Sequence, residues 1–265
     1  MRMVFLLPVA SDVRLHKRIS SLQKLGIESN ILAFERDYYS GKLFSGGYVS
    51  LGRLQNLSYH KRWYPYLKAL PVVRKAAKNA DAIYAFGLDL LWLGWVATLG
   101  LGRPCKFVYE IADLGILSGY NLLGGSLRWL ERFLLKRVTL LVVVAEDYIT
   151  DYYQAFQGIA KSGLNYLVIE NKLDATVLPP PTLSSTKQTG ILRIGYFGLI
   201  RCRRSWEILK TAAIKGNGRI KIYVRGKPMG IKIDEDVQRI PHIEYEGPYV
   251  SPDDLPGMYE KIDMS

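Results

Sequence analysis

Three carboxylates follow predicted strands, at places where chemistry on a bound ligand would be expected. Asp89 comes shortly after the apolar run 83–86, while Glu110 and Asp113 lie at the end of the run 106–111 and just beyond it. Polar residues at the carboxyl ends of parallel strands face the ligand crevice. A carboxylate there could serve as general base for transfer to a hydroxyl group, because the base must reach the attacking oxygen. Any of the three could instead cap a helix, and for Asp89 the cap is slightly favoured.

A second polar group follows the first predicted strand. Asp12 and Arg14 stand at the start of the first predicted helix, which is a crevice position in an open sheet. Arg14 could hold an anionic or sugar ligand there. The alternative is a capped, charged first turn, because Ser11 and Asp12 are both good N-caps.

An arginine-rich segment lies further along the chain. Gly198 ends an apolar run, and Arg201, Arg203 and Arg204 lead into a predicted helix. Glycine lets a backbone approach a ligand closely, a helix N-terminus favours anions, and arginine suits phosphate. The pattern favours a pyrophosphate pocket over a solvated basic loop. Arg225 either borders that pocket or belongs to a plain turn. The spacing matches neither G-x-G-x-x-G nor a P-loop, which disfavours a standard dinucleotide or ATPase site.

These residues need a parallel sheet to position them, and the apolar pattern predicts one. Short apolar runs alternate with segments of helical length, which is the signature of a doubly wound α/β domain. The predicted strands are 4–9, 29–34, 83–86, 106–111, 140–144 and 166–169, and the predicted helices are 15–25, 66–77, 90–99, 127–137 and 149–156.

A segment rich in proline and small polar residues, 178–190, predicts a domain boundary. It separates an N-terminal domain of residues 1–177 from a second region of residues 191–265, which has roughly half the length of a typical domain. In the second region we predict strands 192–197, 220–225 and 243–245 and helices 205–213 and 252–262, the last with Ser251 as N-cap.

Composition limits the classes of function. Lys and Arg outnumber Asp and Glu by 36 to 24, a net charge of +12, which favours anionic partners such as nucleotide phosphates, acidic lipids or nucleic acid. Cys105 and Cys202 have no metal-ligand spacing, so neither zinc nor a disulfide framework is expected, and a reducing compartment fits. The nucleophile elbow of hydrolases is absent. No apolar run approaches the ~18 residues that span a bilayer.

One further segment, 59–68, interleaves aromatic residues with three cations and a histidine. An ordinary amphipathic helix start with snorkelling cations is the first interpretation. A patch that contacts a membrane surface comes second, and a groove for single-stranded nucleic acid comes third.

Several segments resemble, in order along nearly the whole chain, those of family-4-type retaining glycosyltransferases. They are 11–26, 81–89, 107–114, 130–145, 168–171, 194–198 and 243–247. The resemblance implies a GT-B fold, in which two Rossmann-like doubly wound domains face one cleft, with the second domain incomplete here. It further implies that the first domain receives the acceptor, that the second binds the nucleotide-sugar, and that the reaction retains anomeric configuration without a metal or other cofactor.

The resemblance carries over to particular residues, with departures. Gly198 matches the family's glycine before the diphosphate-binding segment, and Arg204 matches a basic residue six positions later. Leu199 stands where the family often has arginine, and Ala112 where it often has histidine. Asp113 or Glu110 would then have to make the polar contact that the histidine makes in the family. The family's E-x7-E motif, which holds the donor sugar and ribose, has no counterpart in this chain.

The resulting expectation is transfer of a sugar from a nucleotide diphosphate donor to a glycan or lipid-linked acceptor. This would serve surface-polysaccharide assembly at the cytoplasmic face of the membrane. Arg201, Arg203 and Arg204 would neutralise the leaving diphosphate, while the acceptor side would be lined by Asp12, Arg14, Asp89 and Asp113. The alternative is a non-catalytic, glycosyltransferase-like binding module at a membrane or partner. Nucleic acid is not an expected partner, and a chain that ended at residue 265 would have little transferase activity.

Overall fold

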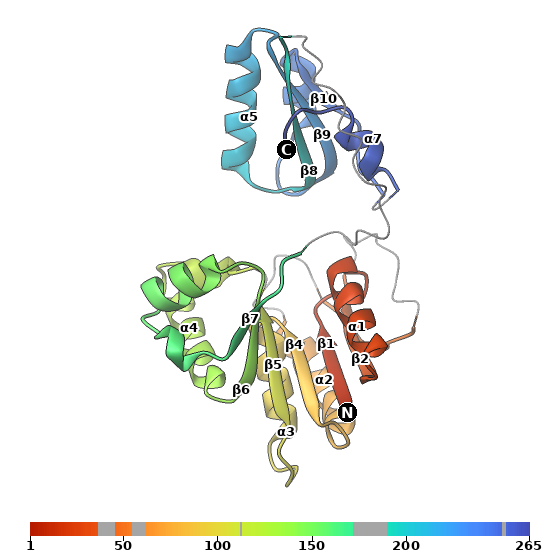
Figure 1. The fold of residues 1–265 in the computed structure, drawn as a ribbon, viewed down its shortest axis with the longest axis vertical. Coiled ribbons are helices and arrows are strands. Elements are labelled where there is room, and N and C mark those ends of the chain that lie inside the picture. Colours follow the sequence, from red (N-terminus) through yellow and green to blue (C-terminus); the bar gives the residue numbers. More distant parts are fainter. Residues whose placement is uncertain (37–45, 55–61, 112, 172–189, 251–252) are drawn as a thin grey trace. The chain divides into compact units, whose positions relative to one another are not determined.

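The structure, a computed structural model, describes residues 1–36, 46–54, 62–111, 113–171, 190–250 and 253–265 (Figure 1). The chain divides into two compact units, Met1–Asn171 and Lys172–Ser265. Each unit is built on its own parallel sheet.

The sheet of the first unit has seven strands in the order β3-β2-β1-β4-β5-β6-β7, and every neighbouring pair is parallel. Its strands are β1 (Arg2–Leu7), β2 (Glu28–Glu35), β3 (Val49–Arg53), β4 (Ala82–Phe86), β5 (Lys106–Ile111), β6 (Val138–Val143) and β7 (Tyr166–Val168). The order of strands reverses between β1 and β4. Ligands of doubly wound sheets bind outside the carboxyl ends of the strands at such a switch point.

Helices cover both faces of this sheet (Figure 1). The α-helices are α1 (Val13–Lys24), α2 (Trp63–Ala77), α3 (Leu88–Thr98) and α4 (Leu122–Leu135). The π-helix η3 (Tyr148–Phe156) follows β6, and the short 3-10 helices are η2 (Gly115–Ser118) and η4 (Lys161–Gly163).

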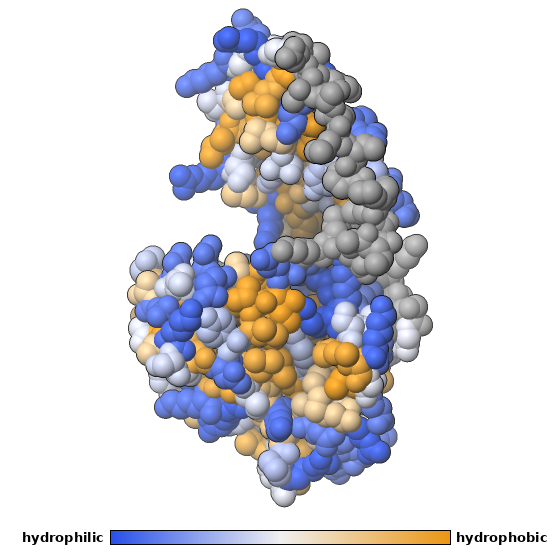
Figure 2. Space-filling model, in the orientation of Figure 1, coloured by the Kyte–Doolittle hydropathy of each residue, from blue (hydrophilic) through white to orange (hydrophobic). Residues whose placement is uncertain are grey.

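Successive side chains of a strand point to opposite faces of the sheet. Phe5 of β1 packs in a cluster with Leu15 of α1, whereas Leu6 packs on the other face with Val73 of α2 and Leu90 of α3. All five residues of β4 are buried, which explains its continuous apolar run. On the α1 face, Val108 and Leu140 are only half-buried, and Figure 2 shows hydrophobic residues gathered over the middle of this sheet.

The second unit has a three-stranded parallel sheet in the order β10-β9-β8. Its strands are β8 (Leu192–Ile200), β9 (Ile220–Pro228) and β10 (Ile243–Tyr245), and its helices are α5 (Arg203–Gly216), α6 (Asp234–Arg239) and α7 (Leu255–Tyr259). Trp206 of α5 is 1% exposed and packs with Ile222 and Val224 on one face of this sheet. Leu255 and Met258 of α7 pack on Tyr223 on the other face.

The predicted strands and helices are present, with shifts of a few residues at their ends. Two predictions need correction. Strands β8 and β9 continue through Ile200 and Pro228, so Gly198 lies within β8 rather than at a turn, and Arg225 lies inside β9 rather than at its end. The edge strand β3 and helix α6 are missing from the prediction. The segment 178–189, with most of the predicted boundary, and the predicted cap at 251–252 lie outside the described residues.

Candidate functional site

The carboxyl edge of the first sheet begins with the turn from β1 into α1. Asp12 is the N-cap of α1 and is 4% exposed; its Oδ1 accepts the backbone N–H of Arg14 at 3.0 Å. The Arg14 guanidinium also donates to both oxygens of Asp12, at 3.0 and 2.6 Å. The predicted capped, charged turn is therefore present. It fixes the direction of the Arg14 side chain, which remains 44% exposed at the crevice edge.

Glu110 lies inside β5 rather than at the mouth of the crevice. It is 5% exposed, and its carboxylate accepts the Tyr84 hydroxyl at 2.6 Å and two N–H groups of Arg18 at 3.2 Å. Burial and the nearby Glu110 charge raise the pKa of Tyr84. These contacts tie α1 to β4 and β5. They engage both oxygens of the Glu110 carboxylate, and its role in catalysis stays a prediction.

Asp89 lies in the first turn of α3, whose N-cap is Gly87 and not Asp89. Its carboxylate accepts the hydroxyl of Tyr66 and forms an ion pair with Arg62 at 3.7 Å. Burial, followed by the Asp89 charge, raises the pKa of the Tyr66 hydroxyl. The Asp89 side chain is 36% exposed, so one side of it faces solvent at the carboxyl edge.

Asp113 is the exposed member of the three predicted carboxylates. It stands two positions beyond the end of β5, as predicted, and its Oδ1 accepts the backbone N–H of Gly115 at 3.0 Å. The charges of Asp113 and Arg14 both act on Tyr148, whose pKa is raised mainly by burial. Residues that follow β1, β5 and β6 therefore meet at this edge. Sequence reasoning missed Tyr148, because nothing in its local pattern distinguishes it from the other tyrosines of η3.

In the second unit, two glycines with positive φ face each other across β8 and β9. Gly198 (φ +112°) pairs with Gly226 (φ +147°), and both angles belong to a region that side chains rarely adopt. A Cβ at position 226 would lie 1.8 Å from the carbonyl oxygen of Gly198, whereas a Cβ at 198 would meet no atom within 4 Å. The space beside Gly198 is therefore open to a ligand at the carboxyl end of β8.

The first turn of α5 follows this glycine after a short connection. Cys202 is the N-cap, and its sulfur accepts the backbone N–H of Ser205. Hydrogen bonding with Ser205 lowers the pKa of the Cys202 thiol. The side chains of Arg201, Arg203 and Arg204 are exposed around the turn, and the first turn has no acidic residue. The N-terminus of a fourteen-residue helix and three exposed arginines thus follow Gly198 within six positions.

Arg225 is held by contacts within its own unit. Its side chain is 15% exposed and forms ion pairs with Glu246 at 3.4 Å and Asp254 at 3.3 Å. It also donates to the backbone carbonyls of Gly247 and Pro248. These contacts fasten residues 246–248 and Asp254 to β9, and whether Arg225 also borders the pocket stays a prediction.

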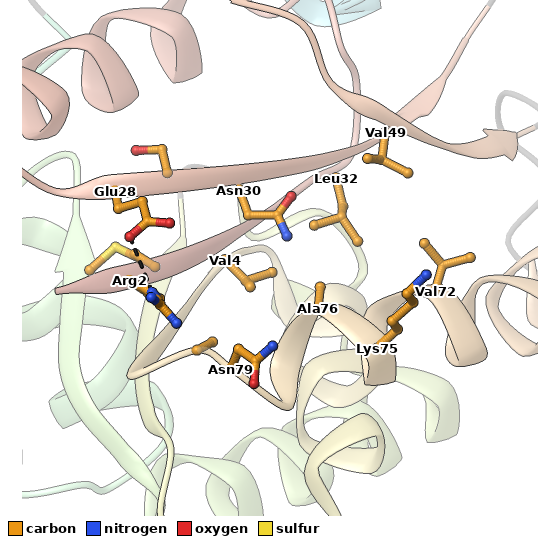
Figure 3. A pocket seen from close by; sticks show the side chains of 13 residues that line it. Arg2, Val4, Glu28, Asn30, Leu32, Val49, Val72, Lys75, Ala76 and Asn79 are labelled. Carbon is orange, nitrogen blue, oxygen red and sulfur yellow. Dashed lines mark hydrogen bonds and ion pairs between the residues drawn. The ribbon is translucent and has the colours of Figure 1, made fainter.

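One pocket lies away from these residues. Its volume is about 590 Å³, and its lining includes Arg2, Glu28, Asn30, Lys75 and Asn79 (Figure 3). These residues stand at the amino ends of β1 and β2 and around the C-terminal end of α2, opposite the switch-point edge. Ala112 and residues 59–61 of the aromatic segment lie outside the described residues. None of the helices in the described part of the chain is both long and apolar enough to span a membrane.

Comparison with known proteins gives several matches. The family model described as "Glycosyl transferase 4-like domain" matches residues 11–162. The succinoglycan biosynthesis protein ExoL of Rhizobium meliloti (strain 1021) is 30% identical in a 201-residue alignment that covers 70% of this chain. The chain spans 47% of that protein's length.

Solved structures share the fold at low identity. HepE of Anabaena, in complex with UDP and glucose, has a TM-score of 0.69 at 18% identity, covering 99% of this chain and 72% of HepE. Sucrose-phosphate synthase of Thermosynechococcus elongatus has a TM-score of 0.69 at 12% identity, covering 99% of this chain and 74% of its own. The fold expected from the sequence, GT-B, is thus confirmed. With more than half of its residues matched by the family model, the chain belongs to the glycosyl transferase 4-like domain family.

Proposed function

We propose that this chain is the acceptor-binding domain and part of the donor-binding domain of a retaining glycosyltransferase. It would transfer a sugar from a nucleotide diphosphate donor to a glycan or lipid-linked acceptor at the cytoplasmic face of a membrane. The family match and the similarity to ExoL, a protein of succinoglycan biosynthesis, support a place in surface-polysaccharide synthesis.

The observation that carries the proposal is the set of features at the start of α5. Gly198 leaves open space at the carboxyl end of β8, α5 begins shortly after it, and Arg203 and Arg204 are exposed in the first turn of that helix. Such a site favours a group with two negative phosphates. In glycosyl transfer the diphosphate is the leaving group, so cations held there stabilise charge that develops as the bond to the sugar breaks.

The acceptor would bind at the carboxyl edge of the first sheet. Arg14, held in direction by Asp12, would contact an anionic or hydroxyl-bearing group of the acceptor. Asp113 is the carboxylate best placed for polar contact with the reacting hydroxyl, because it is exposed and follows β5. Asp89 would line the same edge.

Donor binding is testable by isothermal titration with UDP-glucose and with UDP, since HepE structures hold both ligands. R203Q/R204Q should weaken binding of either ligand by at least ~10-fold, because each lost charge-assisted hydrogen bond is worth about 1.5–3 kcal/mol. The matched control is R219Q, since Arg219 is exposed before β9, at the other end of the second sheet. Equal binding by both variants would refute the phosphate site.

Transfer is tested separately, by release of the nucleoside diphosphate in the presence of a membrane extract that contains lipid-linked glycans. Release that depends on both donor and extract would support the transferase. Nucleotide binding without release would favour the non-catalytic binding module instead.

A further inference from the structure

An unusually exposed apolar surface lies on the outer side of α4 and the turn before it. Tyr120 is 91% exposed, Leu122 92%, Leu123 53% and Trp129 69%. The same residues line one shallow hollow of the surface. Single exposed apolar residues are ordinary, but several large ones together mark a contact surface. We call these four residues the α4 apolar face.

The helix itself gathers this face on one side. Leu122 and Trp129 are seven positions apart, about two helical turns, so they project in the same direction. The opposite side of α4 is buried through Glu131 and Leu134. Trp129 stacks on Phe133 with ring centroids 6.1 Å apart. The exposed residues therefore contribute little to the core and are held in place by a well-packed helix.

Within the segment 114–137, the exposed charges have one sign. The segment 114–137 contains four cations, Arg128, Arg132, Lys136 and Arg137, and a single acidic residue, Glu131. Glu131 is 0% exposed and is enclosed by tyrosine hydroxyls. Arg132, Lys136 and Arg137 are exposed. The segment therefore presents apolar, aromatic and cationic side chains to a partner.

We propose that the α4 apolar face inserts into the interface of a lipid bilayer that carries anionic headgroups. Leucine side chains suit the acyl boundary, tyrosine and tryptophan suit the headgroup level, and the cations at the other end of the helix attract acidic lipids. With fourteen residues, α4 is too short to span a bilayer, so it would lie along the surface. Vesicle binding needs neither donor nor acceptor, so this inference does not depend on the proposed reaction.

The test is flotation of the full chain with vesicles of phosphatidylcholine, with or without phosphatidylglycerol. We expect binding to the anionic vesicles that weakens as salt is added. L122S/W129S should lower the partition coefficient by at least ~10-fold, since burying each large apolar side chain is worth more than a factor of ten. The residues replaced are exposed, so the unfolding midpoint should be unchanged.

The matched control is W63S/L67S, which removes the same two residue types from the exposed side of α2, where Trp63 is 64% and Leu67 52% exposed. This control also tests the segment that the sequence suggested for membrane contact. Loss of vesicle binding with W63S/L67S, but not with L122S/W129S, would overturn the proposal. So would absence of vesicle binding together with self-association, measured by light scattering, that L122S/W129S abolishes, because the partner would then be a second copy of the chain.

Discussion

The buried carboxylate Glu131 provides the sharpest test of how the first unit is held together. It accepts four hydrogen bonds: from Tyr109 at 2.9 Å, Tyr152 at 2.6 Å, Tyr153 at 3.0 Å and the side-chain amide of Gln157 at 2.6 Å. These donors come from β5, η3 and the residue after it. Glu131 therefore fastens the π-helix and the sheet to α4.

Glu131→Ala leaves four buried donors without an acceptor. Each unsatisfied group costs about 1–3 kcal/mol, so the loss should be at least ~4 kcal/mol, a large part of the 5–15 kcal/mol typical of a domain. Glu131→Gln should cost at least ~2 kcal/mol less than the alanine variant. Its amide oxygen can still accept two bonds, and tyrosine hydroxyls can rotate to accept from its NH2 group.

Hydrogen exchange with mass spectrometry, followed through increasing urea, would measure the free energy of opening in peptides of the first unit alone. Burial raises the pKa of the Glu131 carboxyl. A raised folded-state pKa stabilises the fold below the unfolded-state value of ~4.3, and this contribution is lost as pH rises through the folded-state pKa. E131Q should lack that part of the pH dependence. Equal, small losses in both variants would refute the reasoning.

Three further predictions concern other parts of the chain. G226A would place a Cβ 1.8 Å from the carbonyl oxygen of Gly198 in β8, so it should destabilise the second unit by at least ~3 kcal/mol. The same exchange experiment measures this loss, and a variant as stable as the wild type would contradict the backbone geometry at Gly226. Iodoacetamide at neutral pH should alkylate Cys202 before Cys105, because hydrogen bonding lowers the pKa of the Cys202 thiol and burial raises the pKa of the Cys105 thiol. Peptide mass spectrometry measures the order of alkylation, and alkylation of Cys105 first would contradict the prediction. The indole N–H of Trp206 donates to Asp236 and holds the pKa of that carboxyl below its ordinary value. Asp236 therefore stabilises the second unit above pH ~3.9, and this stabilisation is lost as pH falls through its folded-state pKa. In urea titrations at decreasing pH, D236N should not show this loss of stability.

Much of the architecture could be predicted from local pattern. The apolar runs of β4 and β5 are long enough and rich enough in β-branched and aromatic residues to identify strands, and β5 ends at Ile111 as predicted. Strand β3 escaped prediction because it is a short edge strand in which only Leu51 is buried. Helix α6 has six residues and no buried side chain, so it has no apolar period to detect.

The site was harder to predict, because its contacts join distant positions. Arg18 and Glu110 are 92 positions apart, and nothing near Glu110 indicates that a half-buried arginine will engage it. Arg225 likewise pairs with Asp254, which lies 29 positions further along the chain. The pairing of Gly198 with Gly226 depends on strand register. Residue type and spacing indicated the edge of each sheet, and tertiary contacts decided which side chains face solvent there.

The most direct test of the central claim is a crystal structure of this chain with UDP. The account predicts a diphosphate at the start of α5, within hydrogen-bond distance of its first backbone N–H groups and of at least one of Arg201, Arg203 and Arg204, with Gly198 beside it. A diphosphate bound elsewhere, with the first turn of α5 empty, would contradict the account.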